Sequence, residues 1–182
     1  MREAQQNPEP LAEQAFVIIQ ARRGLNASDQ AAREKPVMYA EILHYVLGND
    51  NIDADRVSRA LASNLSNRRV YKQLLAQNRC AYAPREAHAS DSDEVSQRIG
   101  EGFKIKFRAA KSRPGQMYIV LEIDYHNLVA GDKPLILHVS GDEIYCRLAF
   151  PGQIDHQTQV LLATQDPRLL SLRNMDTELS LV

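Results

Sequence analysis

The spacing of apolar residues along the chain changes from a helical to an alternating period near Gly102. Before this point apolar side chains recur every three or four residues, which predicts amphipathic helices. We expect helices over residues 11–23, 36–47, 54–63 and 67–77, with a further short helical piece beginning near Asn26. Gly24 ends the first of these helices and Gly48 ends the helix over 36–47, and Lys35-Pro36 separates that helix from the short piece before it. The first half of the chain is therefore expected to be helical.

Two polar residues indicate where the later helices begin. Asp53 directly precedes the stretch 54–63 and is a favourable N-cap residue. Asn64-Leu65-Ser66 then forms a tight connection, in which Ser66 is expected to cap the helix over 67–77.

From Gly102 onward apolar and polar residues alternate, which predicts strands with one buried face. Six short strands are expected, over 103–108, 117–125, 135–139, 144–150, 157–164 and 177–182. Asp166-Pro167 is expected to start a turn between the last two strands. Short strands separated by turn residues are typical of an antiparallel sandwich or a small barrel.

The fold class is therefore predicted to be α+β, with an N-terminal α-helical domain followed by a C-terminal antiparallel β-sandwich. The helical domain is expected over residues 1–78 and the β-sandwich over residues 102–182. Residues 79–101 between them are rich in alanine, serine and aspartate and are expected to be a linker.

Composition restricts the class of protein further. Of the 182 residues 44% are hydrophobic and 25% charged, and the net charge is −1. Residues 1–90 carry 12 basic and 10 acidic side chains, and residues 91–182 carry 10 and 13. This balance gives no basic footprint, so a nucleic-acid partner is not expected. No apolar run is long enough to span a membrane, and Cys80 and Cys146 are expected to be reduced, so a cytoplasmic location is predicted.

Residues that could carry catalysis do not fall into a recognised spacing. The five histidines match no metal-binding pattern, neither cysteine has catalytic flanking residues, and the glycines are scattered at turns. Glu122 and Asp124 share one strand face, where they are expected to pair with basic residues of the 103–108 strand. We therefore predict no enzymatic activity and no catalytic, cofactor-binding or metal-binding residue.

A DNA-binding alternative rests on the segment 54–77. Its two expected helices and tight turn have the outline of a helix-turn-helix, with Arg68, Arg69 and Lys72 early in the second helix. Asp50, Asp53 and Asp55 lie close by in the sequence and would repel phosphate. A transcriptional regulator of this kind remains the alternative function.

Residues 39–78 also resemble a known family. Leu43-His44-Tyr45-Val46-Leu47-Gly48, followed by the acidic cap Asp53-Ala54-Asp55-Arg56, resembles the helical domain of bacterial anti-sigma factors. In the zinc-binding members a His-x3-Cys-x2-Cys motif follows, and here Ala60, Asn64 and Asn67 stand at the ligand positions. Alanine and amides do not bind zinc, so the resemblance is to a zinc-less form.

The resemblance implies a non-enzymatic regulatory or adaptor protein that binds a partner protein, with a sigma factor as the implied partner. Tyrosine and arginine are enriched at the energetic centres of interfaces. The candidate partner-binding residues are therefore Tyr39, Tyr45, Leu47, Arg68, Arg69 and Tyr71. The alternative for Leu47 and at least two of the tyrosines is a place in the core.

Overall fold

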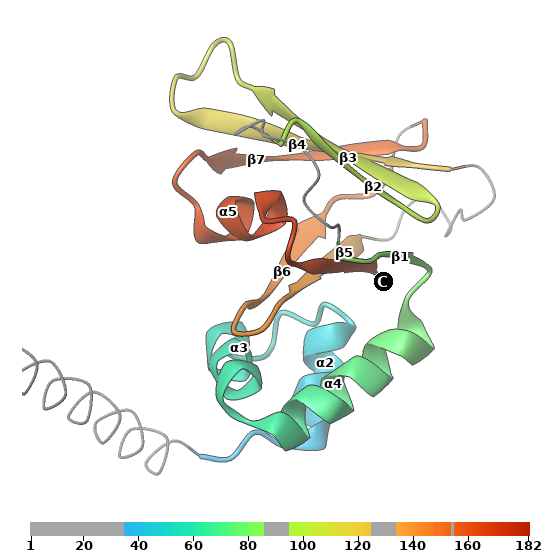
Figure 1. Ribbon diagram of the computed structural model, residues 1–182, viewed down its shortest axis with the longest axis vertical. Helices are drawn as coiled ribbons and strands as arrows, with labels where there is room; N and C mark the ends of the chain where they lie inside the picture. Colours follow the sequence, from blue (N-terminus) through green and yellow to red (C-terminus); the bar gives the residue numbers. More distant parts are fainter. Residues whose placement is uncertain (1–34, 86–94, 125–133, 154) are drawn as a thin grey trace, which may run out of the picture. The chain divides into compact units, whose positions relative to one another are not determined.

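The computed structural model describes residues 35–85, 95–124, 134–153 and 155–182. The chain divides into two compact units, Met1–Pro36 and Val37–Val182, and all described helices and strands belong to the second. These are four helices and two four-stranded antiparallel sheets, a mixture of α and β structure (Figure 1). The helices expected over 11–23 and near Asn26 lie outside the described residues. No helix within the described ranges is long and apolar enough to cross a membrane.

Three helices form the first part of this unit: α2 (Tyr39–Val46), α3 (Ala54–Ser63) and α4 (Leu65–Asn78). The predicted start of α3 is confirmed, because the Asp53 carboxylate accepts a 2.9 Å hydrogen bond from the Arg56 backbone N–H. The predicted start of α4 is two residues late, and its cap is Asn64 in place of Ser66. The Asn64 side-chain oxygen accepts hydrogen bonds from the backbone N–H groups of Ser66 (2.8 Å) and Asn67 (3.3 Å). Both caps satisfy amides that the first helical turn leaves unpaired.

The eight strands form two antiparallel sheets. The first has the order β1-β8-β5-β6, with β1 at Ala81–Ala83, β8 at Glu178–Leu181, β5 at Leu135–Ser140 and β6 at Tyr145–Phe150. The second has the order β2-β3-β4-β7, with β2 at Gln97–Gly100, β3 at Phe103–Ala109, β4 at Gln116–Ile123 and β7 at Gln157–Ala163. The six strands predicted from the alternation correspond to β3 through β8.

The segment 79–101, expected to be a linker, contains the other two strands. Ala81 of β1 pairs with Leu181 of β8, and Arg98 of β2 pairs with Ile105 of β3. Residues 86–94 of this segment lie outside the described residues. The polar composition hid both strands because their inward-facing side chains are small alanines in β1 and an arginine in β2.

The expected turn at Asp166-Pro167 is instead the start of a helix, α5 (Pro167–Arg173). The Asp166 carboxylate accepts a 2.9 Å hydrogen bond from the Arg168 backbone N–H, and proline occupies the first turn, where its missing N–H costs nothing. Leu169 and Leu172 of α5 pack into the core between the two sheets.

The core between the sheets is built from the inward faces of both. It contains the buried apolar residues Phe103, Ile105, Ile119 and Leu121 of one sheet and Leu137, Val139, Leu148, Phe150, Leu179 and Leu181 of the other. Each strand contributes alternate residues, as the period of two requires.

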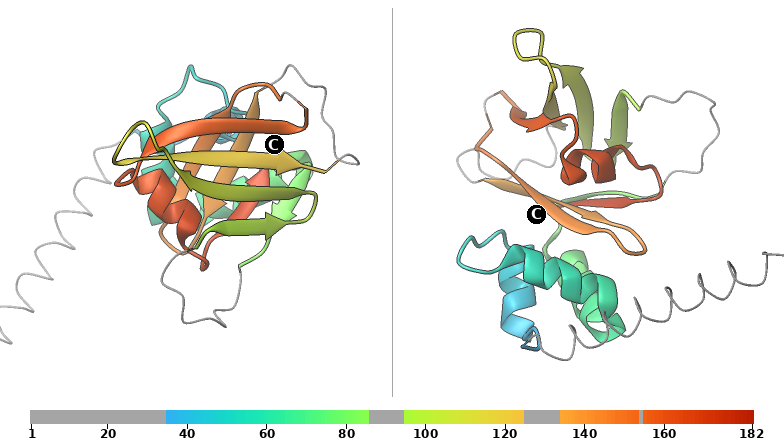
Figure 2. Two further views of the ribbon diagram at one scale, coloured as in Figure 1. Left: turned by 90° about the horizontal axis from the view of Figure 1, so that it is seen from above. Right: turned by 90° about the vertical axis from the view of Figure 1, so that its left-hand side faces the viewer.

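The helices α2, α3 and α4 cover the opposite face of the β1-β8-β5-β6 sheet (Figure 2). All six residues of β5 are consequently buried. Leu135, Leu137 and Val139 point into the core between the sheets, so the alternate residues Ile136, His138 and Ser140 face the helices. The described helices and both sheets thus belong to one compact unit, Val37–Val182.

Candidate functional site

Exposed apolar side chains are concentrated on the helical part of the described structure. Among the described residues six large hydrophobic side chains are exposed, and four of them lie between Met38 and Leu65. They are Met38 (59% exposed), Tyr39 (59%), Leu47 (50%) and Leu65 (58%). We call Met38, Tyr39 and Leu65 the N-terminal patch, because each lies at the first turn of its helix or just before it.

The residues of this patch lie at the N-terminal ends of two helices, and these two ends are on the same side of the helical part. Figure 1 shows α2 and α4 both beginning at the end of the helical part that lies away from the two sheets. Leu47 follows the other end of α2 and is separate from the patch. An exposed group of large apolar side chains on a compact unit is a common feature of protein-binding surfaces.

Two of the predicted partner-binding residues are core residues. Tyr45 is 1% exposed and Tyr71 is fully buried, so neither side chain can reach a partner on this surface. Their rings pack against each other and against His138, with ring centres 5.6 to 6.1 Å apart. Tyr39 and Leu47, in contrast, are exposed and remain candidates.

Arg68 and Arg69, adjacent in the sequence, have different environments. The Arg68 guanidinium donates hydrogen bonds to the carbonyl oxygens of Leu61 (2.8 Å) and Ala62 (2.6 Å) at the end of α3. It therefore satisfies carbonyls that the helix end leaves unpaired. Arg69 is exposed and remains available to a partner or to phosphate.

His138 joins the helices to the sheet. Its Nε2–H donates a 3.0 Å hydrogen bond to the Val46 carbonyl at the end of α2. Because a neutral imidazole has one N–H, its Nδ1 is the acceptor, and the Tyr71 hydroxyl donates to it over 3.1 Å. Burial lowers the pKa of His138 to about 4, although the bond to Val46 opposes this shift. The imidazole is therefore neutral at physiological pH and acts as a structural link.

Arg147 of β6 makes a second link to the same helix end. Its guanidinium donates to the carbonyl oxygens of Tyr45 (3.2 Å) and Asn49 (3.0 Å) and lies 5.1 Å from the centre of the Tyr45 ring. A cation at a helix C-terminus is favoured by the helix dipole. Sequence reasoning missed Arg147 and His138. One signal for His138 was present in the sequence. It is the only ionisable residue in a mostly apolar strand, β5, and a buried ionisable side chain needs hydrogen-bond partners.

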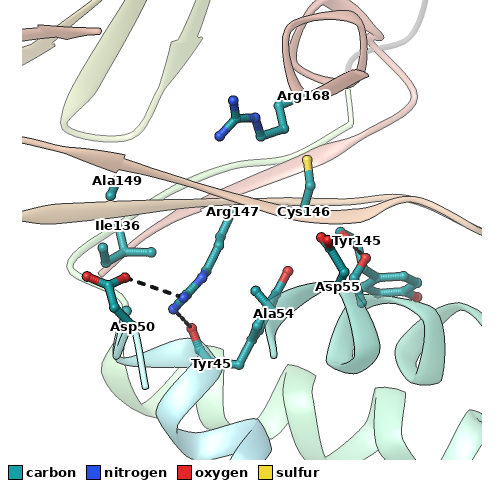
Figure 3. Close-up of a pocket in the computed structure, with 12 residues that line it drawn as sticks. Tyr45, Asp50, Ala54, Asp55, Ile136, Tyr145, Cys146, Arg147, Ala149 and Arg168 are labelled. Atoms are coloured by element: carbon teal, nitrogen blue, oxygen red, sulfur yellow. Dashed lines mark hydrogen bonds and ion pairs between the residues drawn. The ribbon is translucent and has the colours of Figure 1, made fainter. Parts of the chain in front are cut away.

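A pocket of about 320 Å³ lies where α2, α3, β6 and α5 meet (Figure 3). Its polar lining includes Asp50, Asp55 and Arg168. In Figure 3 Arg168 lies on the α5 side of the strand, whereas Asp50 and Asp55 lie on the helical side. The pocket therefore extends around β6 from one face of the sheet to the other.

The two cysteines are free thiols. Burial is the main reason why the pKa of Cys146, which lines this pocket, rises to about 11. Burial also raises the pKa of Cys80. Both thiols are therefore protonated at neutral pH and are weak nucleophiles.

The charged ladder expected on the second sheet is confirmed for Glu122 and not for Asp124. Lys104 lies directly opposite Glu122 in the register of β3 and β4. The Lys106 ammonium is 2.6 Å from the Glu122 carboxylate, which is a diagonal cross-strand pair. Asp124, at the end of the strand, is exposed.

Comparisons with protein-family models, with curated proteins and with solved structures found no match to this chain. The resemblance of residues 39–78 to anti-sigma helical domains therefore stays a prediction. The candidate site rests on the geometry of this chain alone: an apolar patch on the helices, fixed to the sheet through His138 and Arg147.

Proposed function

We propose that this chain is a cytoplasmic, non-enzymatic regulatory or adaptor protein that binds another protein through α2–α4, carried on an antiparallel β-sandwich. The exposure of Met38, Tyr39 and Leu65 is the observation that supports it most directly. Full burial of one large apolar side chain contributes about 1.5–3 kcal/mol, so covering the patch would supply substantial binding energy.

The rest of the helical part suits such a surface. Internal contacts fix α2 at its C-terminal end, through His138 and Arg147, whereas Met38 and Tyr39 at its start are exposed. A preorganised patch loses little conformational entropy on binding. Arg69 supplies an exposed charge on α4, and Leu47 supplies a further apolar contact at the far end of α2. The partner class that the resemblance implies is a sigma factor.

DNA binding through residues 54–77 receives less support. A recognition helix needs cations that are free to contact phosphate or bases. Arg68 is instead bonded to the end of α3, which leaves Arg69 and Lys72 as the exposed cations of that helix start.

Site-specific cross-linking tests the proposal. A photoactivatable phenylalanine analogue at Tyr39 is introduced into the full chain in its native host, and the adducts are identified by mass spectrometry. The matched control carries the same analogue at Tyr118, which lies on β4 of the other sheet. We expect one heterologous protein to be captured from Tyr39 and not from Tyr118. Capture of the same proteins from both positions, or none from Tyr39, contradicts the proposal.

A further inference from the structure

The outer edge of β6 has no neighbouring strand. In the sheet order β1-β8-β5-β6 this strand pairs with β5 on one side only. Edge strands present backbone N–H and C=O groups that can pair with another chain, and many proteins cover them for this reason.

The hydrogen-bond pattern shows which backbone groups of β6 point outward. Ile136 of β5 exchanges two 2.9 Å hydrogen bonds with Val182, so its backbone faces β8. In an antiparallel sheet the direction alternates, so Leu135, Leu137 and Val139 bond to β6. Their partners are Phe150, Leu148 and Cys146. The residues between them, Tyr145, Arg147 and Ala149, consequently direct their backbone groups to the outer edge.

One outward group already has a partner. The Tyr145 carbonyl accepts a hydrogen bond from the Ser58 hydroxyl of α3, which agrees with this assignment. Within the described part of the chain no hydrogen bond reaches the backbone N–H or C=O of Arg147 or Ala149 from the outer side. The N–H and C=O groups of these two residues are therefore available along this edge.

The pocket described above runs beside this edge (Figure 3). Tyr145, Arg147 and Ala149 all line it, and α3 and α5 form its two walls through Asp55 and Arg168. The free edge is thus not a flat rim but one side of a groove of about 320 Å³.

We propose that the outer edge of β6 binds an extended segment of a partner protein, which adds a fifth strand to the β1-β8-β5-β6 sheet. Alternating donors and acceptors at strand spacing, about 3.4 Å per residue, match another polypeptide backbone. A small molecule would not satisfy this row of groups in the same way. This site lies apart from the N-terminal patch and does not depend on it.

Charge on the groove walls selects the side chains of the added strand. Asp50, which is almost fully exposed and pairs with the Arg147 guanidinium over 3.8 Å, and Asp55 line the helical side, so the two aspartates and Arg147 together give this side one net negative charge. Arg168 on the other side is already bonded to Asp166 through both carboxylate oxygens. Because side chains of a strand alternate between two faces, every second residue of the segment faces these aspartates. We expect lysine or arginine at such positions.

Peptide selection tests this site directly. Random short peptides displayed on phage are selected on the immobilised full chain, and the enriched sequence is synthesised with a fluorescent label for anisotropy. We expect enrichment of extended sequences with basic residues at alternate positions. Bound peptide should slow the exchange of the Arg147 and Ala149 amides. Two methylated peptides are then compared, one N-methylated at its odd-numbered residues and one at its even-numbered residues. Because only alternate N–H groups of the peptide face β6, one of the two should lose binding and the other should keep it.

A matched pair of proline variants gives the control. Ala149→Pro removes an outward N–H and leaves the β5–β6 ladder intact, which edge strands tolerate. Between β4 and β7 the backbone N–H of Ile123 donates to the His156 carbonyl and that of Thr164 to the Gly115 carbonyl, so the backbone groups of Ala163 point away from β4. Ala163→Pro is therefore the equivalent change on β7, an edge strand of the second sheet. We expect Ala149→Pro to weaken the peptide about tenfold or more and Ala163→Pro to change it less than about twofold.

Two outcomes overturn the inference: no enriched peptide, or a peptide that binds Ala149→Pro as tightly as the unchanged chain. The methylated peptides decide the matter even if a proline variant folds poorly. A Met38→Ser/Leu65→Ser variant that carries the photoactivatable analogue at Tyr39 should keep peptide affinity and lose the cross-linked partner, so failure of the edge site and failure of the helical patch are distinguishable.

Discussion

His138 of β5 and Tyr71 of α4 are joined by a buried hydrogen bond of 3.1 Å between the imidazole Nδ1 and the phenol hydroxyl. This bond links the sheet to the helices, and Val46 occupies the other ring nitrogen. The placement of the helical surface therefore depends on a histidine that is far from it in the sequence.

Acid should destabilise the protein through this histidine. The pKa of His138 is about 4 in the folded state and 6.5 for an ordinary histidine, so the unfolded state binds more protons between these values. The stabilising contribution is complete above pH 6.5 and is lost as the pH falls toward 4. Between pH 7.5 and 5 we expect a loss of about 2 kcal/mol. Urea titrations at pH 7.5 and pH 5 measure the free energy of unfolding of the unchanged protein and of His138→Gln, which has no titrating group at this position. Equal losses in the two proteins would contradict the prediction.

Removal of the Tyr71 hydroxyl should destabilise the fold while preserving its packing. Tyr71→Phe leaves the buried Nδ1 of His138 without a donor, which costs about 1–3 kcal/mol. Tyr118→Phe, at a half-buried position on β4, should change the free energy of unfolding by less than about 0.5 kcal/mol. Chemical denaturation of the two variants compares them, and similar values would mean that the buried bond contributes little.

Arg98 should be more important to stability than any exposed arginine. It is 1% exposed and donates to the Leu172 and Asn174 carbonyls and to both oxygens of Thr177 beyond the end of α5. Arg98→Met leaves these acceptors without the donor and should cost about 3 kcal/mol or more. Thermal and urea unfolding measure the loss. Near-normal stability of this variant would show that water replaces the guanidinium.

The adjacent pair Arg68 and Arg69 offers an internal control. Arg68→Ala removes two hydrogen bonds to the end of α3 and should destabilise the protein by about 1 kcal/mol or more. Arg69→Ala should have an effect below about 0.5 kcal/mol. Urea denaturation and duplex-DNA titration at low salt are measured on both. Loss of DNA binding in Arg68→Ala at unchanged stability would favour the helix-turn-helix alternative.

Helices and strands were predictable from the sequence wherever the spacing of apolar residues matches the face that is buried. The strands β3 to β8 and the helices α2 and α3 follow from apolar spacing and from caps such as Asp53. β1 and β2 escaped because alanines and Arg98 fill their inward positions. α5 escaped although Asp166-Pro167 is a favourable helix start, because a turn explains the same two residues.

The candidate site was predictable only in part. Tyr39, Leu47 and Arg69 are exposed as a binding surface requires, and Tyr45 and Tyr71 are not. An amphipathic helix shows which face is apolar, but it does not tell which apolar residues a distant sheet will cover. That information lies in Tyr145 and His138, more than sixty residues further along the chain than Tyr71.

The two-sided burial of β5 restricts how this protein can change in evolution. A strand sandwiched between layers cannot lose either layer without exposing Ile136 and His138, or Leu137 and Val139, to water. Recombination could therefore not transfer the helices alone to an unrelated protein. Inheritance of the binding surface requires inheritance of the strand beneath it, and homologues should gain or lose the two together.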